Sequence, residues 1–354
     1  MSTETKKTLA AAGVFVSIIT GAGFATGREL LTFFAGFGPL GALGFALACA
    51  VLGLCGWAVM DISWRKPVSG YKAFMELLLG RRFGGIMVAL CNVFIFVMMT
   101  AMLAGGGAAA AMISPASFPI STGTGALILA ILCFITFLFD LKGIMSVSLI
   151  FAPVLILGGL FFGIHAAITA TTPVFLGAQS QALSFLWPAV IYASYNLLTS
   201  VAVLSILGAQ IGSPRAARRA AFIAGGTIFV LGLAFLAPIY IHYPSLQNIP
   251  VPLLALAEAS GGAVEGLYIL VLFTAIFTTA VANGFAVIEW LNSLILPRFP
   301  WAKTPVKAAV ALGGAALAQL GFSTFIDVVY PAFGYIGLFQ IAAVLVYFVA
   351  GKKA

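Results

Sequence analysis

The stretch SIITGAGFATGREL, residues 17–30, lies within the first hydrophobic segment of the chain. It places Gly21, Gly23 and Gly27 near the middle of that segment. Each glycine costs about 1 kcal/mol relative to alanine in a helix interior, so helical winding is weakest here. The three glycines do not all fall on one helix face, which disfavours a simple close-packing surface. The pattern predicts a helix that is interrupted inside the membrane, with freed backbone groups facing protein or a wet cavity.

The rest of the chain is as apolar as this first segment. Of the 354 residues, 62% are hydrophobic and 7% are charged, and the mean hydropathy is +1.17. A water-soluble domain of this length needs far more charge to cover its surface, so the composition predicts a polytopic membrane protein. The apolar runs are continuous over about 20 residues, which favours helices over a β-barrel.

We expect ten transmembrane helices in one transporter domain that occupies residues 1–354. When the N-terminus is placed in the cytoplasm, every basic residue among the 17 except Arg28 falls in an inner segment. The net charge of +8 therefore marks the cytoplasmic face of an inner-membrane protein with both termini inside, and no nucleic-acid partner is expected. The apolar run Ile249–Ala257 is too short to span and predicts an interfacial or re-entrant helix. The expected spans are residues 8–34, 39–63, 84–112, 124–139, 144–168, 183–208, 216–241, 264–294, 305–322 and 327–349.

A second interruption is expected in the sixth span, which contains WPAVIYASYNLLTSVAVL. Pro188 disturbs the hydrogen-bond ladder in its first half. Polar side chains at midplane usually face the interior of the helix bundle. Spans 1 and 6 open two five-span halves, about 8–168 and 183–349, and the halves are inverted because five is odd. Interrupted spans at corresponding positions point to an inverted-repeat transporter and its binding site. The polar cluster consists of Tyr192, Ser194, Tyr195, Asn196, Thr199 and Ser200.

These features resemble the LeuT fold of the amino acid–polyamine–organocation superfamily, and TGAGFATGREL is most similar to the YkvI family of proposed amino acid permeases. The resemblance implies an all-α membrane protein with a 5+5 inverted repeat and broken helices 1 and 6. It also implies that the two breaks hold the substrate. Half-helix N-termini carry unpaired N–H groups that suit a substrate carboxylate. The implied substrate-binding residues are Gly21, Ala22, Gly23 and Phe24 of span 1, and Tyr192, Ser194, Tyr195 and Asn196 of span 6.

The same resemblance implies a sodium ion between spans 1 and 8. Five oxygen ligands suit a hard cation such as Na⁺. Span 5 contains no lysine, whereas some sodium-independent relatives place one near this site, so the coupling ion is favoured. The alternative is that the threonines of span 8 hydrogen-bond their own backbone at the preceding turn. No organic cofactor is expected. The implied ligands are Ser17, Thr20, Ala275, Thr278 and Thr279.

Arg28 and Asp327 are implied by the resemblance to form an outer gate above the substrate. An unpaired charge inside a membrane is costly, so Arg28 needs a partner. The alternatives are a loop carboxylate, Glu258 or Glu265, or an interfacial charge without function. Glu29 follows Arg28, but neighbouring helical residues point about 100° apart. No acidic side chain is expected to be well placed at either break, which argues against polyamines and other strong cations.

The sequence thus favours a secondary active transporter, which moves a small amino acid or related zwitterion by alternating access and is coupled to Na⁺. Its expected partners are a small-molecule substrate and the lipid bilayer. An enzyme is not expected, because no cluster of His, Cys and Asp lies at one membrane depth. Two alternatives stay open, namely a proton-coupled or uncoupled permease for another small solute, and a non-transporting channel or sensor with the same fold.

Overall fold

The computed structural model describes residues 3–68, 70–139, 157–169 and 183–351, and these residues form helices and no strand. Six of the helices are long and apolar enough to cross a membrane. The expectation of an all-α, multi-pass membrane protein is therefore confirmed. The six are α4 (Pro39–Arg65), α5 (Gly70–Ile113), α8 (Leu186–Gln210), α9 (Pro214–Ile241), α12 (Gly262–Ile295) and the run Phe322–Ala350, which comprises α14 (Phe322–Thr324), η3 (Phe325–Val329) and α15 (Tyr330–Ala350).

The other four expected spans correspond to shorter helices. The first is divided into α1 (Thr3–Ile19), α2 (Ala22–Ala25) and α3 (Arg28–Phe33). The remaining three contain α6 (Thr122–Leu138), a helix over Leu157–Ile168 and α13 (Lys303–Ala318). Part of the fifth expected span, residues 144–156, lies outside the described residues. The count of ten spans thus stays a prediction.

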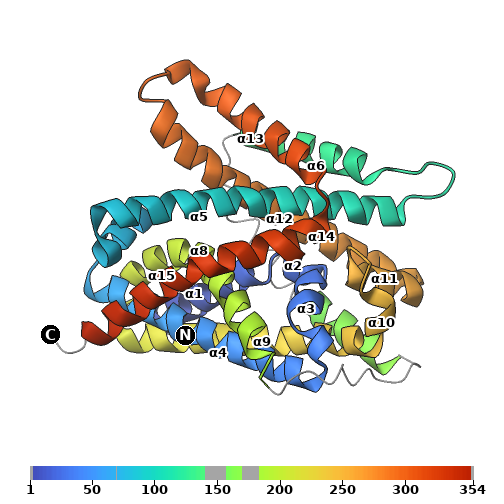
Figure 1. The fold of residues 1–354 in the computed structure, drawn as a ribbon, viewed down its shortest axis with the longest axis horizontal. Coiled ribbons are helices and arrows are strands. Elements are labelled where there is room, and N and C mark those ends of the chain that lie inside the picture. Colours follow the sequence, from blue (N-terminus) through green and yellow to red (C-terminus); the bar gives the residue numbers. More distant parts are fainter. Residues whose placement is uncertain (1–2, 69, 140–156, 170–182, 352–354) are drawn as a thin grey trace.

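The helices run largely along the long axis of the molecule (Figure 1). Helix α8 packs against α4 and α15, and α1 packs against α9. Helix α5 packs against α12, α6 and α13, and α13 also packs against α6. The short helices α10 (Tyr243–Leu246) and α11 (Pro252–Ser260) lie near α3, at the end away from the C-terminus. Helix α11 overlaps the run Ile249–Ala257, which the sequence predicts to be a short non-spanning helix.

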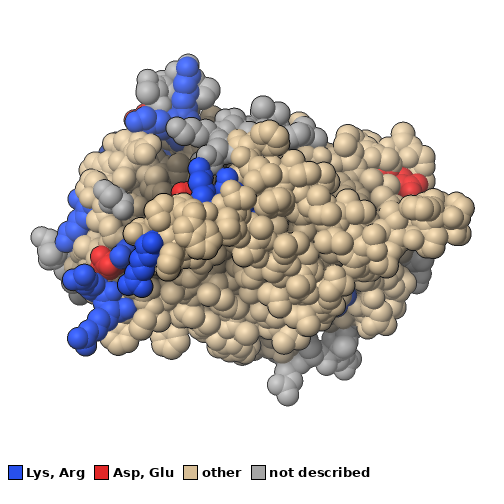
Figure 2. Space-filling view, turned by 90° about the horizontal axis from the view of Figure 1, so that it is seen from above, with Lys and Arg blue, Asp and Glu red and all other residues tan. Residues whose placement is uncertain are grey.

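Charged side chains are confined to particular parts of the surface. Figure 2 shows Lys and Arg gathered at the end of the molecule where the C-terminus lies, and a broad uncharged belt beside them. Such a belt is what the hydrocarbon core of a bilayer requires, and basic residues on one side follow the positive-inside pattern. The distribution supports the predicted orientation, with the basic end in the cytoplasm.

The expected break in the sixth span is wrong for this structure, because α8 is a continuous helix from Leu186 to Gln210. Pro188 lies in the first turn of α8. N–H groups in the first turn make no hydrogen bond within the helix, so the missing N–H of proline breaks none. The polar side chains further along α8 bond to backbone carbonyls of the same helix: Asn196 Nδ2 donates to Tyr192 O at 2.9 Å, and Ser200 Oγ donates to Asn196 O at 2.6 Å. Apart from the Tyr192 hydroxyl, which has no hydrogen-bond partner among the described residues, the polar cluster is therefore satisfied without unwinding.

Candidate functional site

The first span is interrupted where its glycines lie. Helix α1 ends at Ile19, the four-residue α2 follows, and α3 begins at Arg28. Gly27 joins α2 to α3 with φ 79°, in the left-handed region that favours glycine. A Cβ atom on Gly27 would also lie 2.6 Å from Leu253 Cγ. Conformation and space both require glycine here.

Backbone groups freed by the interruption are bonded to protein. The Thr26 hydroxyl donates to Gly23 O at 2.7 Å. The N–H of Leu253 in α11 donates to Thr26 O at 3.1 Å, and from α12 the Tyr268 hydroxyl donates to Ala25 O at 2.6 Å. Because an unpaired backbone carbonyl in the membrane costs several kcal/mol, these contacts stabilise the interrupted geometry.

A buried carboxylate lies directly behind the interruption. Glu29, in the first turn of α3, is 4% exposed, and its Oε2 accepts a hydrogen bond of 2.9 Å from the Tyr195 hydroxyl of α8. A Cβ atom on Gly23 would lie 2.9 Å from Glu29 Cδ, so the carboxylate rests against the glycine stretch. Glu29 forms no ion pair within the described residues. The expectation that no acidic residue lies at a break is therefore wrong.

Sequence reasoning missed Glu29 for an identifiable reason. A 100° offset separates Glu29 from Arg28 on the helix, but it does not show what Glu29 faces. Its partner, Tyr195, lies 166 residues further along the chain. The available signal was the carboxylate itself, because an ionisable residue in an apolar segment needs a partner or a function.

Aromatic rings pack around Tyr195, the hydrogen-bond partner of this carboxylate. The Tyr195 ring lies 5.4 Å from that of Tyr192, 5.5 Å from that of Phe33 and 5.1 Å from that of Tyr330. Tyr192 and Tyr330 are completely buried, and within the described part of the chain their hydroxyls have no hydrogen-bond partner. Buried hydroxyls are rarely left unpaired, so this cluster combines polar groups with unused bonding capacity. We call Glu29, Tyr192, Tyr195 and Tyr330 the acidic tyrosine cluster.

Arg28 points away from that cluster and pairs with Asp327. Its Nε and Nη2 both donate to the Asp327 carboxylate, the former at 3.2 Å, and Thr32 Oγ1 donates to Asp327 Oδ1 at 2.7 Å. Nη1 donates to the carbonyls of Gln247 and Ile249, at 2.8 and 3.2 Å. Asp327 lies in η3, a π-helical turn that precedes α15. The pair named as a gate is thus in contact, and neither Glu258 nor Glu265 is the partner of Arg28.

The predicted substrate residues do not all face one another. Among the described residues, Gly23 of the first span and Tyr195 of α8 both contact Glu29. Phe24 packs its ring against Phe45 and Phe235, with centroids 6.3 and 5.7 Å away. The Ser194 hydroxyl donates to Gly334 O of α15 at 2.5 Å. Asn196 bonds within α8, as described above. The predicted residues of α8 thus contact different elements, and only some of them lie next to the interruption.

The predicted sodium ligands show a mixed picture. The Thr279 side chain lies 3.4–3.5 Å from the position of a Cβ atom on Gly21, so α12 contacts the interruption where the ion was expected. However, Thr278 Oγ1 donates to Thr274 O at 2.8 Å, and Thr20 Oγ1 donates to Val16 O at 2.8 Å. The Thr278 hydroxyl thus makes the within-helix bond of the alternative interpretation, whereas Thr20 was expected to bind the ion through its backbone carbonyl. Ala275 is buried and Ser17 is half-buried.

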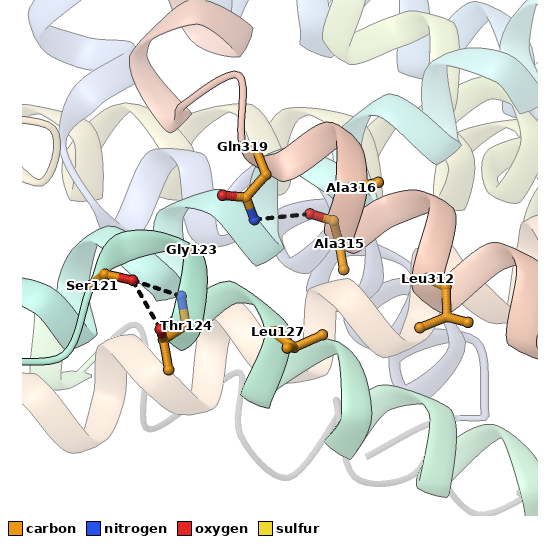
Figure 3. A pocket seen from close by; sticks show the side chains of 8 residues that line it. All are labelled: Ser121, Gly123, Thr124, Leu127, Leu312, Ala315, Ala316 and Gln319. Carbon is orange, nitrogen blue, oxygen red and sulfur yellow. Dashed lines mark hydrogen bonds between the residues drawn. The ribbon is translucent and has the colours of Figure 1, made fainter.

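A separate hollow of about 520 Å³ lies between α6 and α13. In Figure 3, Leu127 and Leu312 lie along it, and Ser121 and Gln319 bond within their own segments. Ser121 Oγ accepts from the Thr124 N–H at 3.1 Å, and Gln319 Nε2 donates to Ala315 O at 3.3 Å. None of the predicted site residues lines this hollow. Its position therefore gives no support to the substrate site predicted at the interrupted span.

Two proteins of Bacillus subtilis (strain 168) are similar to the chain over almost its whole length. The uncharacterized membrane protein YkvI is 29% identical over 346 residues, which cover 94% of this chain and 93% of YkvI. The chain is a relative of YkvI. The uncharacterized protein YyaD is 28% identical over 337 residues, 94% of this chain and 95% of YyaD. The resemblance to YkvI seen in the glycine stretch is confirmed, although no family model matches the chain.

Solved structures share the fold of this YkvI relative. Mhp1, a nucleobase-cation-symport-1 family transporter in a closed conformation with bromovinylhydantoin bound, has a TM-score of 0.66 at 13% identity, over 98% of this chain and 79% of Mhp1. MhsT in complex with L-phenylalanine has a TM-score of 0.65 at 13% identity, over 96% and 88%. A Na⁺-coupled sialic acid symporter has a TM-score of 0.60 at 15% identity, over 95% and 77%. These neighbours confirm the LeuT-type transporter fold.

Proposed function

We propose that this protein is a secondary active transporter that carries a small amino acid or related zwitterion by alternating access, coupled to Na⁺. The observation that carries the proposal is the interruption of the first span between Ile19 and Arg28, inside a transporter fold. The interruption contacts α8, α11 and α12, so a solute bound there would influence several elements at once. MhsT with L-phenylalanine and the Na⁺-coupled symporter support the choice of solute and ion.

Transport is tested by counterflow in proteoliposomes that contain the purified chain. We expect saturable exchange of a labelled amino acid, at least tenfold faster in NaCl than in KCl. Equal exchange in both salts would remove sodium coupling and leave the proton-coupled or uncoupled permease. Flux that does not saturate would instead support a channel.

The sodium site is tested with Thr279→Ala, because this side chain lies against Gly21. We expect the stimulation by Na⁺ to fall at least tenfold, since a ligand oxygen is lost. The matched control is Thr227→Ala, because the Thr227 hydroxyl is exposed and bonds only to Ile223 O of its own helix. Unchanged stimulation in Thr279→Ala would contradict the proposed position of the ion.

We further propose that Arg28 and Asp327 form the outer gate. Their bidentate contact joins α3 to the π-turn before α15, and Arg28 also holds the loop carbonyls of Gln247 and Ile249. We expect Arg28→Asp and Asp327→Arg each to abolish counterflow, because each places two like charges in contact. The double exchange should recover part of the flux. Failure of the double exchange to recover any flux, while Thr32→Val retains it, would argue against a gate made by this pair.

A further inference from the structure

Glu29 has no cationic partner among the residues that the structure describes. Its two carboxylate oxygens can accept about four hydrogen bonds, and the described residues supply one, from the neutral Tyr195 hydroxyl. An ionised carboxylate buried at this depth is costly without a positive partner. Arg28, its neighbour in sequence, uses Nε, Nη1 and Nη2 on Asp327 and on loop carbonyls. The chain therefore leaves the charge of Glu29 to be balanced from outside.

The walls around Glu29 favour one kind of positive partner. Tyr192, Tyr195 and Tyr330 present aromatic rings that attract cations through their electron-rich faces. Phe33 and Phe94 extend the same wall, with ring centroids 5.5 and 6.2 Å from that of Tyr195. A bare metal ion prefers to be surrounded by oxygen atoms, which rings do not supply. An organic ammonium group that takes the place of the Tyr195 hydroxyl can donate to the Glu29 carboxylate and cover the rings as well.

Binding at this position would also have a mechanical effect. The Tyr195–Glu29 hydrogen bond connects the outer part of the first span to α8. The rings are in contact, so a ligand must displace the Tyr195 hydroxyl and shift at least one ring to reach the carboxylate. Occupation would thus replace a bond between two elements by a bond to the ligand. This is the differential contact that a change between conformations requires.

We propose that the acidic tyrosine cluster is the recognition site for a positively charged nitrogen of the transported solute, with Glu29 as counter-ion and the tyrosine rings as walls. The inference rests on the proposed transport function and deepens it, because it assigns the residues that bind the ammonium group of the solute. It replaces the expectation from the sequence that organic cations are disfavoured.

The test is thermal unfolding of the full chain in detergent with three pairs of probes. Choline, n-butylammonium and L-alanine carry an ammonium group, whereas 3,3-dimethylbutan-1-ol, n-butanol and propionate lack it. Ligands that bind the folded state raise the unfolding temperature by mass action. We expect at least one ammonium compound to raise it by several degrees, and its analogue to leave it unchanged. Equal effects within every pair, or no effect of any ammonium compound, would overturn the inference.

The variants locate the site. Glu29→Gln should weaken binding of the effective compound at least tenfold, whereas Glu265→Gln, which removes a half-buried carboxylate at the start of α12, should leave it unchanged. Tyr195→Phe should retain or strengthen binding, because it removes the hydroxyl that competes for Glu29, and it keeps the test informative if Glu29→Gln does not fold. Wild-type affinity in Glu29→Gln would overturn the inference.

Two outcomes separate this inference from the function on which it rests. Saturable counterflow of a solute without a positive nitrogen, unaffected by Glu29→Gln, would leave the transporter standing and remove the ammonium site. Glu29-dependent changes of the unfolding temperature with pH, without any response to ammonium compounds, would show that a proton balances the carboxylate and would also overturn the inference.

Discussion

At the scale of single residues, Gly23 matters because Glu29 lies against it. A side chain at position 23 would meet the carboxylate, which is buried and cannot swing into water. The interruption therefore depends on glycine for space as well as for flexibility. At a helix position where the added Cβ atom meets no neighbour, replacing glycine by alanine would instead stabilise the helix by about 1 kcal/mol.

We predict that Gly23→Ala retains the fold but loses transport at least tenfold, because Glu29 must move and release Tyr195. The matched control is Gly13→Ala in α1, where a Cβ atom would have no neighbour within 4 Å. Gly13→Ala should unfold at the same or a higher temperature and keep its counterflow. Normal counterflow in Gly23→Ala would show that the position of the carboxylate is not critical.

Sequence patterns predicted the interruption and missed its chemistry for the same physical reason. Helix propensity is local, so Gly21, Gly23 and Gly27 predict weak winding without knowledge of the fold. The pairing of Arg28 with Asp327 was expected only because the chain resembles a family. The pairing of Glu29 with Tyr195 joins distant segments and follows no short pattern.

At the scale of elements, α8 shows how tertiary contacts override local signals. Its polar residues suggested unwinding, yet they bond within α8 and to its neighbours. Gln340 of α15 donates from Nε2 to Leu197 O at 3.1 Å, and Cys91 of α5 donates to Leu198 O at 3.2 Å. Those bonds could not be foreseen, because a polar residue in a membrane helix satisfies either its own backbone or a partner elsewhere.

Close approach of α8 and α15 gives a stability prediction. A Cβ atom on Gly337 would lie 2.5 Å from the backbone carbonyl oxygen of Ser194, so Gly337→Ala must separate the two helices. We expect it to lower the free energy of unfolding by about 1–3 kcal/mol, as overpacking does. Gly226→Ala in α9 is the control, since that position is open. Equal thermal unfolding of both variants would show that the contact adjusts without cost.

At the scale of the whole molecule, hydropathy and charge asymmetry predicted the class of protein well, because they are summed over many residues and tolerate local errors. The number of spans was less secure. Short helices such as α6 and α13 have only 17 and 16 residues, and part of the fifth expected span lies outside the described residues.

The basic end of the molecule predicts the orientation (Figure 2). We expect the C-terminus in the cytoplasm, because Lys and Arg collect at that end. Fusion of alkaline phosphatase, which is active only outside the cytoplasm, to the C-terminus should give no activity, whereas fusion of a green fluorescent protein should give fluorescence. An active phosphatase fusion would reverse the proposed topology and place the Arg28–Asp327 pair on the inner side.

The hydrogen bond from Leu253 to Thr26 links α11 to the joint between α2 and α3. A displacement of that joint must either carry α11 with it or break this contact. A fluorophore attached to α11 would then change its signal when the joint between α2 and α3 moves inside the bilayer. Movements of the interrupted span could in this way be followed without a label near the substrate.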